Sequence, residues 1–314
     1  MAPSSDPQAF RAAIKSAKTV IILAGAGLSA GSGIPTYRGA DGLWIKQDPK
    51  KLATPEGFKA DASAIWQFYH SRRDTCLQAQ PNAAHTFLAS LSIPSVCERL
   101  LPSLSDNEKP PLFITQNFDS LSTRALEALH EEGKLSDEEI KIAKERLIEM
   151  HGSVFRTICT DCKHVKFTYD TPLCPALAST EEEGGDVEDV KKIPLAELPR
   201  CGGTSWNGRS NRYGSCGGLL RPGVVWFGEV PEGLGEIARK LNWAELLIVV
   251  GTSSLVHPAA SFQKTVRDRR GKVAVFNLNR SEGDDLADFL FLGPCEETLV
   301  DIFQAEVGVS SNVH

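Results

Sequence analysis

The chain alternates between short apolar runs and amphipathic stretches over most of its length. Five runs rich in Val, Ile, Leu and Phe lie at 19–27, 111–119, 245–254, 272–279 and 288–295. Runs of this length, bounded by glycine or asparagine, are typical of buried parallel strands. Segments with helical periodicity lie between them, at 82–91, 121–132, 235–243, 259–270 and 296–303. Strand and helix in alternation predict an α/β fold built on a doubly wound, Rossmann-like parallel sheet.

A small polar cluster stands at the end of each apolar run. These clusters contain Ser29, Gln116, Asn117, Asp119, Gly251, Thr252, Ser253, Asn277, Asn279 and Cys295. Asn and Asp at such positions are also explained by turn formation and helix capping. In doubly wound sheets, however, a ligand binds beyond the carboxyl ends of the strands. We therefore expect the five clusters to converge on one crevice.

Two segments, 34–77 and 152–219, interrupt the alternation. The first holds a polar loop and then a helical stretch at 61–75, and the second holds two cysteine pairs, an acidic stretch and a glycine-rich stretch. We expect them to form a second, smaller domain beside a main domain made of 1–33, 78–151 and 220–314. The run at 131–150 predicts one additional exposed helix, because its "SDEE" resembles a capping box.

Composition and charge exclude several classes of function. Of the 314 residues 41% are hydrophobic and 24% charged, and the net charge is -6, whereas a sequence-independent nucleic-acid binder carries a basic surplus. We therefore expect no direct nucleic-acid binding. The apolar runs fall short of the ~20 residues of a membrane span, and the first 20 residues lack the apolar core of a secretory signal. We expect a monomer in the cytoplasm or nucleus, with the mitochondrion as the alternative. In a reducing compartment the eight cysteines would be metal ligands, core residues or free thiols.

Gly25, Gly27 and Ala30 satisfy the pattern G-x-G-x-x-A directly after the first predicted strand. Glycine lets the backbone approach a pyrophosphate, whose charge the N-terminus of the next helix favours. The pattern alone is weak, because glycine turns after strands are common. Pro35 then stands where the first helix of a dehydrogenase would still continue. A dinucleotide site with so short a helix disfavours hydride transfer.

Longer motifs follow one another along nearly the whole chain. They are "GAGLSAGSGIPTYRG" at 25–39, "TQNFD" at 115–119, "HGS" at 151–153, two cysteine pairs, "VVWFGE" at 224–229 and "VGTSS" at 250–254. In this order and context they resemble the sirtuin family of NAD-dependent protein deacylases. The resemblance implies NAD as cofactor and an acyl-lysine protein substrate bound as an extended peptide. Nicotinamide, an O-acyl-ADP-ribose and free lysine would be the products.

The resemblance assigns roles to the polar clusters. His151 would be the general base, a role that suits a side chain titrating near neutral pH, although a lone histidine is more often structural. Asn117 and Asp119 would position the nicotinamide carboxamide and a bound water, and Gln116 would contact ribose. The implied catalytic set is His151, Asn117 and Gln116. The implied cofactor-binding residues are Gly25, Ala26, Gly27, Ser29, Ala30, Pro35, Thr36, Tyr37, Arg38, Trp44, Gln116, Asn117, Asp119, Gly251, Thr252, Ser253, Asn277, Asn279 and Cys295.

Three positions depart from the usual pattern of the family. Tyr37 replaces the usual phenylalanine, Phe118 the usual isoleucine, and Ser122 a frequent histidine. We expect Phe118 and Ser122 to leave the fold intact and to bear on nicotinamide exchange. The added hydroxyl of Tyr37 is expected to be tolerated where it reaches solvent.

The cysteine pairs resemble the structural zinc site of the family. Cys159, Cys162, Cys201 and Cys216 would supply four thiolates in tetrahedral geometry, which leaves no open position for catalysis. The spacing of the first pair is the expected one, whereas 14 residues separate the second pair. Cys174 and His164 are the substitutes if the second pair does not bind. The smaller domain is therefore expected to be both helical and zinc-binding.

The last set of residues concerns the substrate. "VVWFGE" alternates like a strand, and by resemblance the segment Val225, Trp226, Phe227, Gly228 and Glu229 would pair with the substrate backbone by β-augmentation. "LATPEGF" at 52–58 and "WQFYHSRR" at 66–73 resemble the desuccinylase branch. There a Tyr-x-x-Arg pair, matching Tyr69 and Arg72, binds the acyl carboxylate, and a small residue matching Ala53 enlarges the pocket.

The chemistry of such a pair fits an acidic acyl group. An unpaired carboxylate is costly in a partly dry pocket, whereas guanidinium binds it bidentately and a phenol adds a donor. The sequence therefore predicts a lysine deacylase for succinyl, malonyl and glutaryl groups. Taken alone, Tyr69 and Arg72 would be a half-buried tyrosine beside a surface arginine. The alternatives are a general sirtuin deacetylase or mono-ADP-ribosyltransferase, a catalytically silent NAD-binding module, and an NAD-dependent dehydrogenase.

Overall fold

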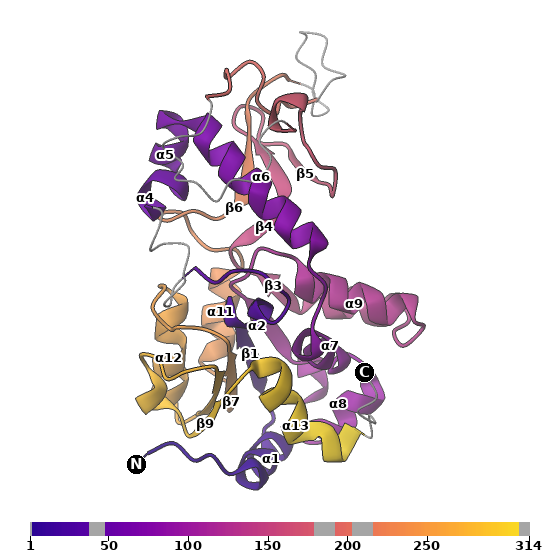
Figure 1. Ribbon diagram of the computed structural model, residues 1–314. Helices are drawn as coiled ribbons and strands as arrows, with labels where there is room; N and C mark the ends of the chain where they lie inside the picture. The colour runs from indigo at the N-terminus through magenta and orange to yellow at the C-terminus, as the bar shows by residue number, and fades with distance from the viewer. Residues whose placement is uncertain (1, 38–47, 179–191, 203–215, 308–314) are drawn as a thin grey trace.

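A six-stranded parallel sheet forms the larger part of the molecule, the lower part in Figure 1. The computed structural model describes residues 2–37, 48–178, 192–202 and 216–307. Its sheet has the strand order β3-β2-β1-β7-β8-β9. The strands are β1 Val20–Ala24, β2 Leu112–Thr115, β3 Leu147–Glu149, β7 Leu246–Val250, β8 Lys272–Asn277 and β9 Phe289–Leu292. All their pairings are parallel, so the expectation of a doubly wound sheet with five of these strands is confirmed.

The strand β3 was not expected. The sequence pattern predicts one helix over 131–150, and helix α10 Asp137–Glu145 begins with the expected capping box between Ser136 and Glu139. The helix then ends, and the next residues pair with β2 through the register Phe113↔Leu147. The prediction of a continuous helix is therefore wrong for its last part. Three half-buried residues are too few to leave a strand period in the sequence.

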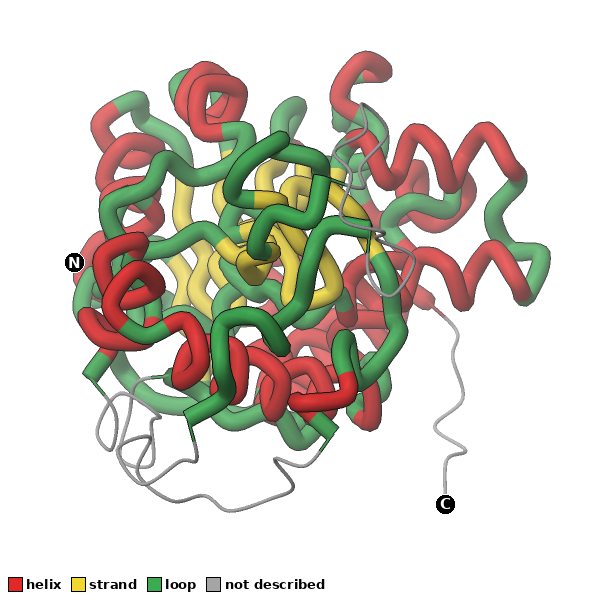
Figure 2. Tube along the Cα trace, turned by 90° about the horizontal axis from the view of Figure 1, so that it is seen from above, coloured by secondary structure: helices red, strands yellow, loops and turns green. Residues whose placement is uncertain are grey.

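Helices cover both faces of the sheet because the strands are buried on both sides (Figure 2). Along β1, Ile22 packs in one hydrophobic cluster while Ile21 and Leu23 pack in another on the opposite face, as the two-residue period of a strand requires. The first cluster receives α1 Pro7–Ser16, α7 Ala83–Ser90, α8 Pro94–Leu100 and α13 Cys295–Val307, and the second receives α11 Leu234–Leu241 and α12 Phe262–Asp268. Helix α9 Leu121–Glu131 packs with α7 and α10.

Among the described residues, the upper part in Figure 1 holds a second, antiparallel sheet of order β5-β4-β6 and the helices that pack against it. Its strands are β4 Gly152–Cys159, β5 Val165–Phe167 and β6 Leu220–Val224, and its helices are α4 Pro49–Leu52, α5 Pro55–Ala60 and α6 Ala62–Gln78. Trp66 of α6 and Phe155 of β4 lie in one hydrophobic cluster. The remaining short helices are α2 Gly27–Ala30, η1 Asp106–Glu108, η2 Pro175–Leu177, η5 Ala259–Ser261 and η6 Asp284–Leu286.

The hydrophobic cluster shared by α6 and β4 supports a division of the chain into two domains. The sequence analysis places the boundary between residues 219 and 220, whereas we propose that 34–77 and 152–224 form one smaller domain and that 1–33, 78–151 and 225–314 form the main one. Because β6 pairs with β4, we place residues 220–224 with the smaller domain rather than with the main one. Among the described residues, no helix has the length and apolar character needed to cross a membrane.

Candidate active site

A cavity of about 940 Å³ lies where the carboxyl ends of the parallel strands face the smaller part of the molecule. All five predicted polar clusters line it, so their expected convergence is confirmed. The lining also includes the other predicted site residues that the structure describes: Gly25, Ala26, Gly27, Ala30, Pro35, Thr36, Tyr37, Ala53, Tyr69, Arg72, His151, Val225, Trp226, Phe227, Gly228 and Glu229. Arg38 and Trp44 lie outside the described residues.

The glycine turn after β1 ends in a helix of only four residues, α2, as Pro35 predicts. Two strand ends meet here without side chains between them. A Cβ atom on Gly25 would lie 2.6 Å from the Cβ of Thr252, and one on Gly251 would lie 2.3 Å from the backbone nitrogen of Leu28. Gly251 also has a φ of 62°, which strains residues with a side chain. The cavity floor therefore requires glycine at these positions for steric reasons.

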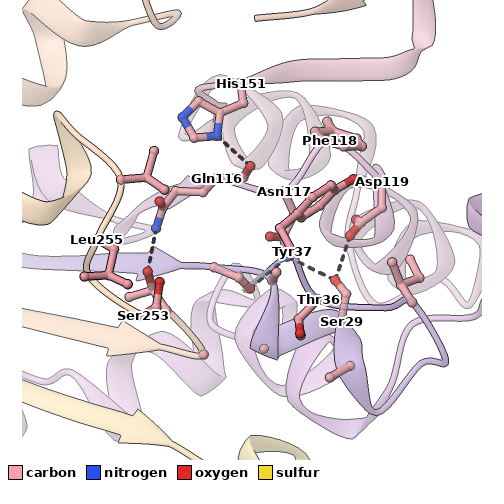
Figure 3. Close-up of a pocket in the computed structure, with 18 of the residues that line it drawn as sticks. Ser29, Thr36, Tyr37, Gln116, Asn117, Phe118, Asp119, His151, Ser253 and Leu255 are labelled. Atoms are coloured by element: carbon pink, nitrogen blue, oxygen red, sulfur yellow. Dashed lines mark hydrogen bonds between the residues drawn. The ribbon is translucent and has the colours of Figure 1, made fainter. Parts of the chain in front are cut away.

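Ser29, Asn117 and Asp119 form one buried hydrogen-bond network (Figure 3). The Asn117 amide donates to the Gly25 carbonyl and to Ser29 Oγ, both at 3.0 Å. Ser29 Oγ in turn donates to Asp119 Oδ2 at 2.7 Å, and the Leu121 backbone N–H donates to Asp119 Oδ1 at 2.9 Å. Burial raises the pKa of Asp119, and the two donors oppose that shift. The network locks the ends of β1 and β2 to each other.

His85 extends this network, and the sequence analysis missed it. Its Nε2 lies 3.4 Å from Ser29 Oγ, and the Asn82 backbone N–H donates to its Nδ1 at 3.3 Å. Because Nδ1 accepts, the proton of the neutral ring is on Nε2 and is directed at Ser29. Burial lowers the pKa of His85 to about 3, so the ring is neutral. In the sequence this residue reads only as a position in the first turn of α7, so no local signal marks it.

His151 lies two residues after the end of β3 and lines the cavity. Its Nδ1 lies 2.8 Å from the backbone carbonyl of Gln116 (Figure 3). A carbonyl only accepts, so Nδ1 carries the proton and Nε2 keeps its lone pair. Burial lowers the pKa of His151, while the Gln116 carbonyl opposes the shift. The side chain of Gln116 donates to Thr252 Oγ1 at 3.1 Å, which ties β2 to β7.

Tyr69 and Arg72 both lie on α6 and line the cavity with Ala53. Nε and Nη1 of Arg72 are buried and have no hydrogen-bond partner among the described residues. Nη2 reaches Ser71 Oγ at 3.3 Å, and the guanidinium lies 5.7 Å from the centre of the Phe68 ring. A partly buried guanidinium with unmade hydrogen bonds is costly unless an anion completes it.

The hydroxyl group of Tyr69 can donate a hydrogen bond into the cavity. Its oxygen accepts a hydrogen bond of 3.0 Å from the indole Nε1 of Trp226. Burial raises the pKa of Tyr69, so the hydroxyl keeps its proton at neutral pH. With one lone pair engaged by the indole, the O–H bond is directed elsewhere.

The prediction of a strand at 224–229 is wrong for all but its first residue. Strand β6 ends at Val224, and a turn follows. Gly228 has a φ of 89°, and the carboxylate of Glu229 accepts from the Trp226 backbone N–H at 2.8 Å. These two features bend the chain away from extended geometry. The Phe227 N–H donates to the carbonyl of Ala53 at 2.9 Å, which joins the turn to the chain between α4 and α5.

Four cysteines form a compact cluster apart from the cavity. Reactive atoms of Cys159, Cys162, Cys201 and Cys216 all lie within 4.8 Å of one another. The Sγ atoms of Cys159 and Cys216 are 3.4 Å apart, and those of Cys162 and Cys201 are 3.7 Å apart. Four thiolates at a Zn–S distance of about 2.3 Å have tetrahedral edges of about 3.8 Å, so the cluster fits zinc. The substitutes Cys174 and His164 lie outside the cluster.

The chain is similar in sequence and in structure to known proteins. The Sir2 family model matches residues 25–258. The NAD-dependent protein deacylase sirtuin-5, mitochondrial, of Xenopus tropicalis is 42% identical over 299 residues, which are 95% of this chain and 85% of that protein. A crystal structure of a Sir2 homologue with NAD has a TM-score of 0.69 at 30% identity and covers 97% of this chain and 95% of that one. A Sir2 mutant with a p53 peptide and NAD has a TM-score of 0.67 at 25% identity and covers 97% and 100%. The chain therefore belongs to the Sir2 family, the sirtuins.

Proposed function

We propose that this NAD-dependent protein deacylase removes acidic acyl groups (succinyl, malonyl or glutaryl) from lysine side chains of proteins. The observation that carries the proposal is the guanidinium of Arg72, which lines the cavity and has two buried nitrogens without a hydrogen-bond partner in the described part of the chain. A terminal carboxylate on the acyl chain supplies a charged acceptor for this guanidinium, which can bind it bidentately along an edge that includes Nη2.

Tyr69 adds to the selectivity. Its proton is available because the Trp226 indole already donates to its oxygen, so it completes the binding of the same carboxylate as a third donor. An acetyl group carries no charge and would leave Arg72 unpaired and partly dehydrated. Acetyl-lysine is therefore expected to be the poorer substrate.

The polar floor of the cavity fits NAD. Its residues combine a side-chain-free glycine turn with the network of Ser29, Asn117 and Asp119, which suits a pyrophosphate and a carboxamide. Bound NAD would supply the ribose carbon that takes up the acyl oxygen as nicotinamide leaves. Asn117 and Asp119 would orient the carboxamide and a water, and Gln116 would contact ribose. His151 would accept the proton of a ribose hydroxyl at Nε2, the nitrogen that the Gln116 carbonyl leaves unprotonated.

The remaining cofactor is structural. Cys159, Cys162, Cys201 and Cys216 would hold one zinc ion with no open position, so the ion stabilises the smaller part and takes no part in the chemistry.

The Sir2 structure with a p53 peptide supports a protein substrate, and we propose that it binds as an extended peptide beside residues 225–229. We propose that the protein acts as a monomer and without direct contact to nucleic acid. The relatives whose names place them in mitochondria favour the mitochondrion over the cytoplasm and nucleus as its compartment.

A panel of acyl-lysine peptides tests the specificity. One peptide sequence carrying succinyl-, malonyl-, glutaryl- or acetyl-lysine is supplied with NAD, and kcat/KM is measured from lysine release. We expect the acidic peptides to exceed the acetyl peptide at least about tenfold, the effect of one or two charge-assisted hydrogen bonds. Arg72→Met removes this preference and leaves residual deacetylation.

The matched control is Arg239→Met on α11, an exposed arginine remote from the cavity, which should leave the preference intact. An acetyl peptide equal to or better than the succinyl peptide would refute acidic-acyl specificity and favour a general sirtuin deacetylase. ADP-ribosylated protein as the main product would favour the mono-ADP-ribosyltransferase reading instead.

A further inference from the structure

A second layer of charged and aromatic side chains stands behind Tyr69. It consists of Arg221 on β6, and of Trp226 and Glu229 in the turn that follows, and we call these three residues the Trp226 clamp. The functional site described above uses the indole of Trp226 only as a hydrogen-bond donor. Contacts within the Trp226 clamp fix the position and orientation of this indole.

Arg221 holds the indole from one face. Its guanidinium carbon lies 3.6 Å from the centre of the Trp226 ring, within the range of a strong cation–π contact. Its Nη2 donates to Glu229 Oε2 at 2.9 Å and to the Val224 carbonyl at 2.8 Å. Its Nη1 donates to the other oxygen of Glu229. The pair is therefore bidentate, a geometry that fixes the plane of the guanidinium.

Glu229 links the ion pair to the backbone of Trp226. The same Oε2 accepts from the Trp226 N–H at 2.8 Å, so both the main chain and the ring of Trp226 depend on the ion pair. Phe58 packs against the indole at 5.4 Å between ring centres. Trp226 is 3% and Tyr69 2% exposed, so water cannot replace the hydrogen bond between them.

The direction of that hydrogen bond sets the direction of the Tyr69 proton. Indole Nε1 is only a donor, so the phenol oxygen must accept. The phenol proton then lies away from Trp226, and Tyr69 shares the cavity lining with Arg72, one turn further along α6. A rotated indole would leave the phenol free to turn its proton elsewhere.

We propose that Arg221 and Glu229 are positioning residues for acyl selectivity, which hold Trp226 so that Tyr69 presents its proton to the acyl carboxylate. This inference rests on the proposed function and adds to it the residues that set its specificity. Neither residue is expected to touch the acyl group. Their contribution to selectivity belongs to acidic acyl groups alone, because an acetyl group offers the phenol no charged acceptor.

The test compares selectivity rather than activity. The ratio of kcat/KM for succinyl-lysine to that for acetyl-lysine is measured in wild type, Arg221→Gln, Tyr69→Phe and the double variant. We expect Arg221→Gln to lower the ratio about tenfold, the loss of one charge-assisted hydrogen bond. In the Tyr69→Phe background it should lower the ratio no further. Arg221→Lys keeps the cation and is expected to restore part of the ratio, and it serves as the second variant if Arg221→Gln does not fold.

Arg156→Gln is the matched control. Arg156 lies on the adjacent strand β4, pairs with Glu232 and donates to the Gly223 carbonyl at 3.1 Å, so it braces the same segment without touching Trp226. Its ratio should stay at the wild-type value. The Nε1–H resonance of Trp226, assigned by its loss in Trp226→Phe, should shift in Arg221→Gln and in Tyr69→Phe but not in Arg156→Gln.

The outcomes separate the two proposals. A wild-type enzyme that prefers acetyl-lysine overturns the proposed function and this inference with it. A succinyl preference that Arg221→Gln leaves unchanged, or lowers just as far in the Tyr69→Phe background, overturns only the role of the clamp. An unshifted Trp226 resonance in Arg221→Gln does the same.

Discussion

A single hydrogen bond decides which nitrogen of His151 can act as a base. The Gln116 carbonyl fixes the proton on Nδ1, and burial lowers the pKa of the ring below its ordinary value of 6.5. The imidazole is therefore neutral at pH 7, with its lone pair on Nε2. Both effects arise from the position of His151 between β3 and β4, since neither is a property of histidine itself.

The lowered pKa of His151 should be visible in the pH profile of kcat/KM. The charged form is disfavoured by burial, so His151 protonates only when the pH falls through its lowered pKa, and the base is lost there. We expect kcat/KM for the succinyl peptide to be level around pH 7 and to fall about tenfold per pH unit on the acid side of an apparent pKa below 6.5.

His151→Ala should lower kcat by about 10²–10⁴ and remove this acid limb. His130→Ala is the control, because His130 lies on α9 away from the cavity. An acid limb centred above pH 6.5, or one that survives His151→Ala, would contradict the assignment of His151 as the base.

At the scale of elements, the cavity depends on how closely two strand ends approach. The Gly27 N–H donates to the Gly251 carbonyl at 2.7 Å, which joins the turn after β1 to the turn after β7. The neighbouring strands β1 and β7 are also where the strand order reverses direction in sequence, and such a switch point is where doubly wound sheets bind ligands. Side chains are excluded there so that backbone groups can form the floor.

Gly251→Ala tests this packing. Its Cβ would meet the Leu28 nitrogen at 2.3 Å at a positive φ, so backbone must move, and we expect a loss of about 2–4 kcal/mol in the free energy of unfolding. NAD affinity should fall with it. Gly235→Ala is the opposite case, since Gly235 lies in α11 with open space around it, and it should gain about 0.5–1 kcal/mol. Urea denaturation of both variants distinguishes the cases. Equal effects of the two changes would argue against steric exclusion at the cavity floor.

At the scale of the whole molecule, the metal cluster and the cavity are separate. None of Cys159, Cys162, Cys201 and Cys216 lines the cavity, although β4 begins beside His151 and ends at Cys159. The cluster ties the end of β4 to the segment that leads into β6, and β6 leads into the turn with Trp226 and Glu229. Zinc would therefore act on catalysis by holding the smaller part together.

Removal of zinc should therefore lower the thermal stability of the protein, and activity should be lost only as a consequence. We expect about one zinc per chain by elemental analysis and a fall of several degrees in Tm when a chelator removes it or when Cys159 is replaced by serine. Activity should fall in parallel with the folded fraction. Cys97→Ser, a buried cysteine outside both cluster and cavity, should leave the metal content unchanged. Full activity and an unchanged Tm in a zinc-free protein would refute the structural role.

The parts of the site that lie in contiguous motifs could be predicted from the sequence. The glycine turn and the cluster Gln116, Asn117 and Asp119 each follow a buried strand, and parallel strands bring their carboxyl ends to one edge. His151 was identified from its motif alone. The first cysteine pair and the second were also placed correctly as one cluster. The strand-end features depend on local period and on topology, both of which the order of residues encodes, whereas the cysteine cluster was inferred from the resemblance to the sirtuin family.

What the sequence by itself determined is therefore the alternation of strand and helix, the edge of the sheet at which the polar residues meet, and the chemistry they can perform. The tertiary structure alone decided the partners: His85 behind Ser29, the strand β3 after α10, the turn in place of a strand at 225–229, and Arg221 over Trp226. Each of these depends on contacts between segments distant in the chain or on side-chain geometry, and such contacts leave no period in the sequence because packing and hydrogen bonds select them only after the chain has folded.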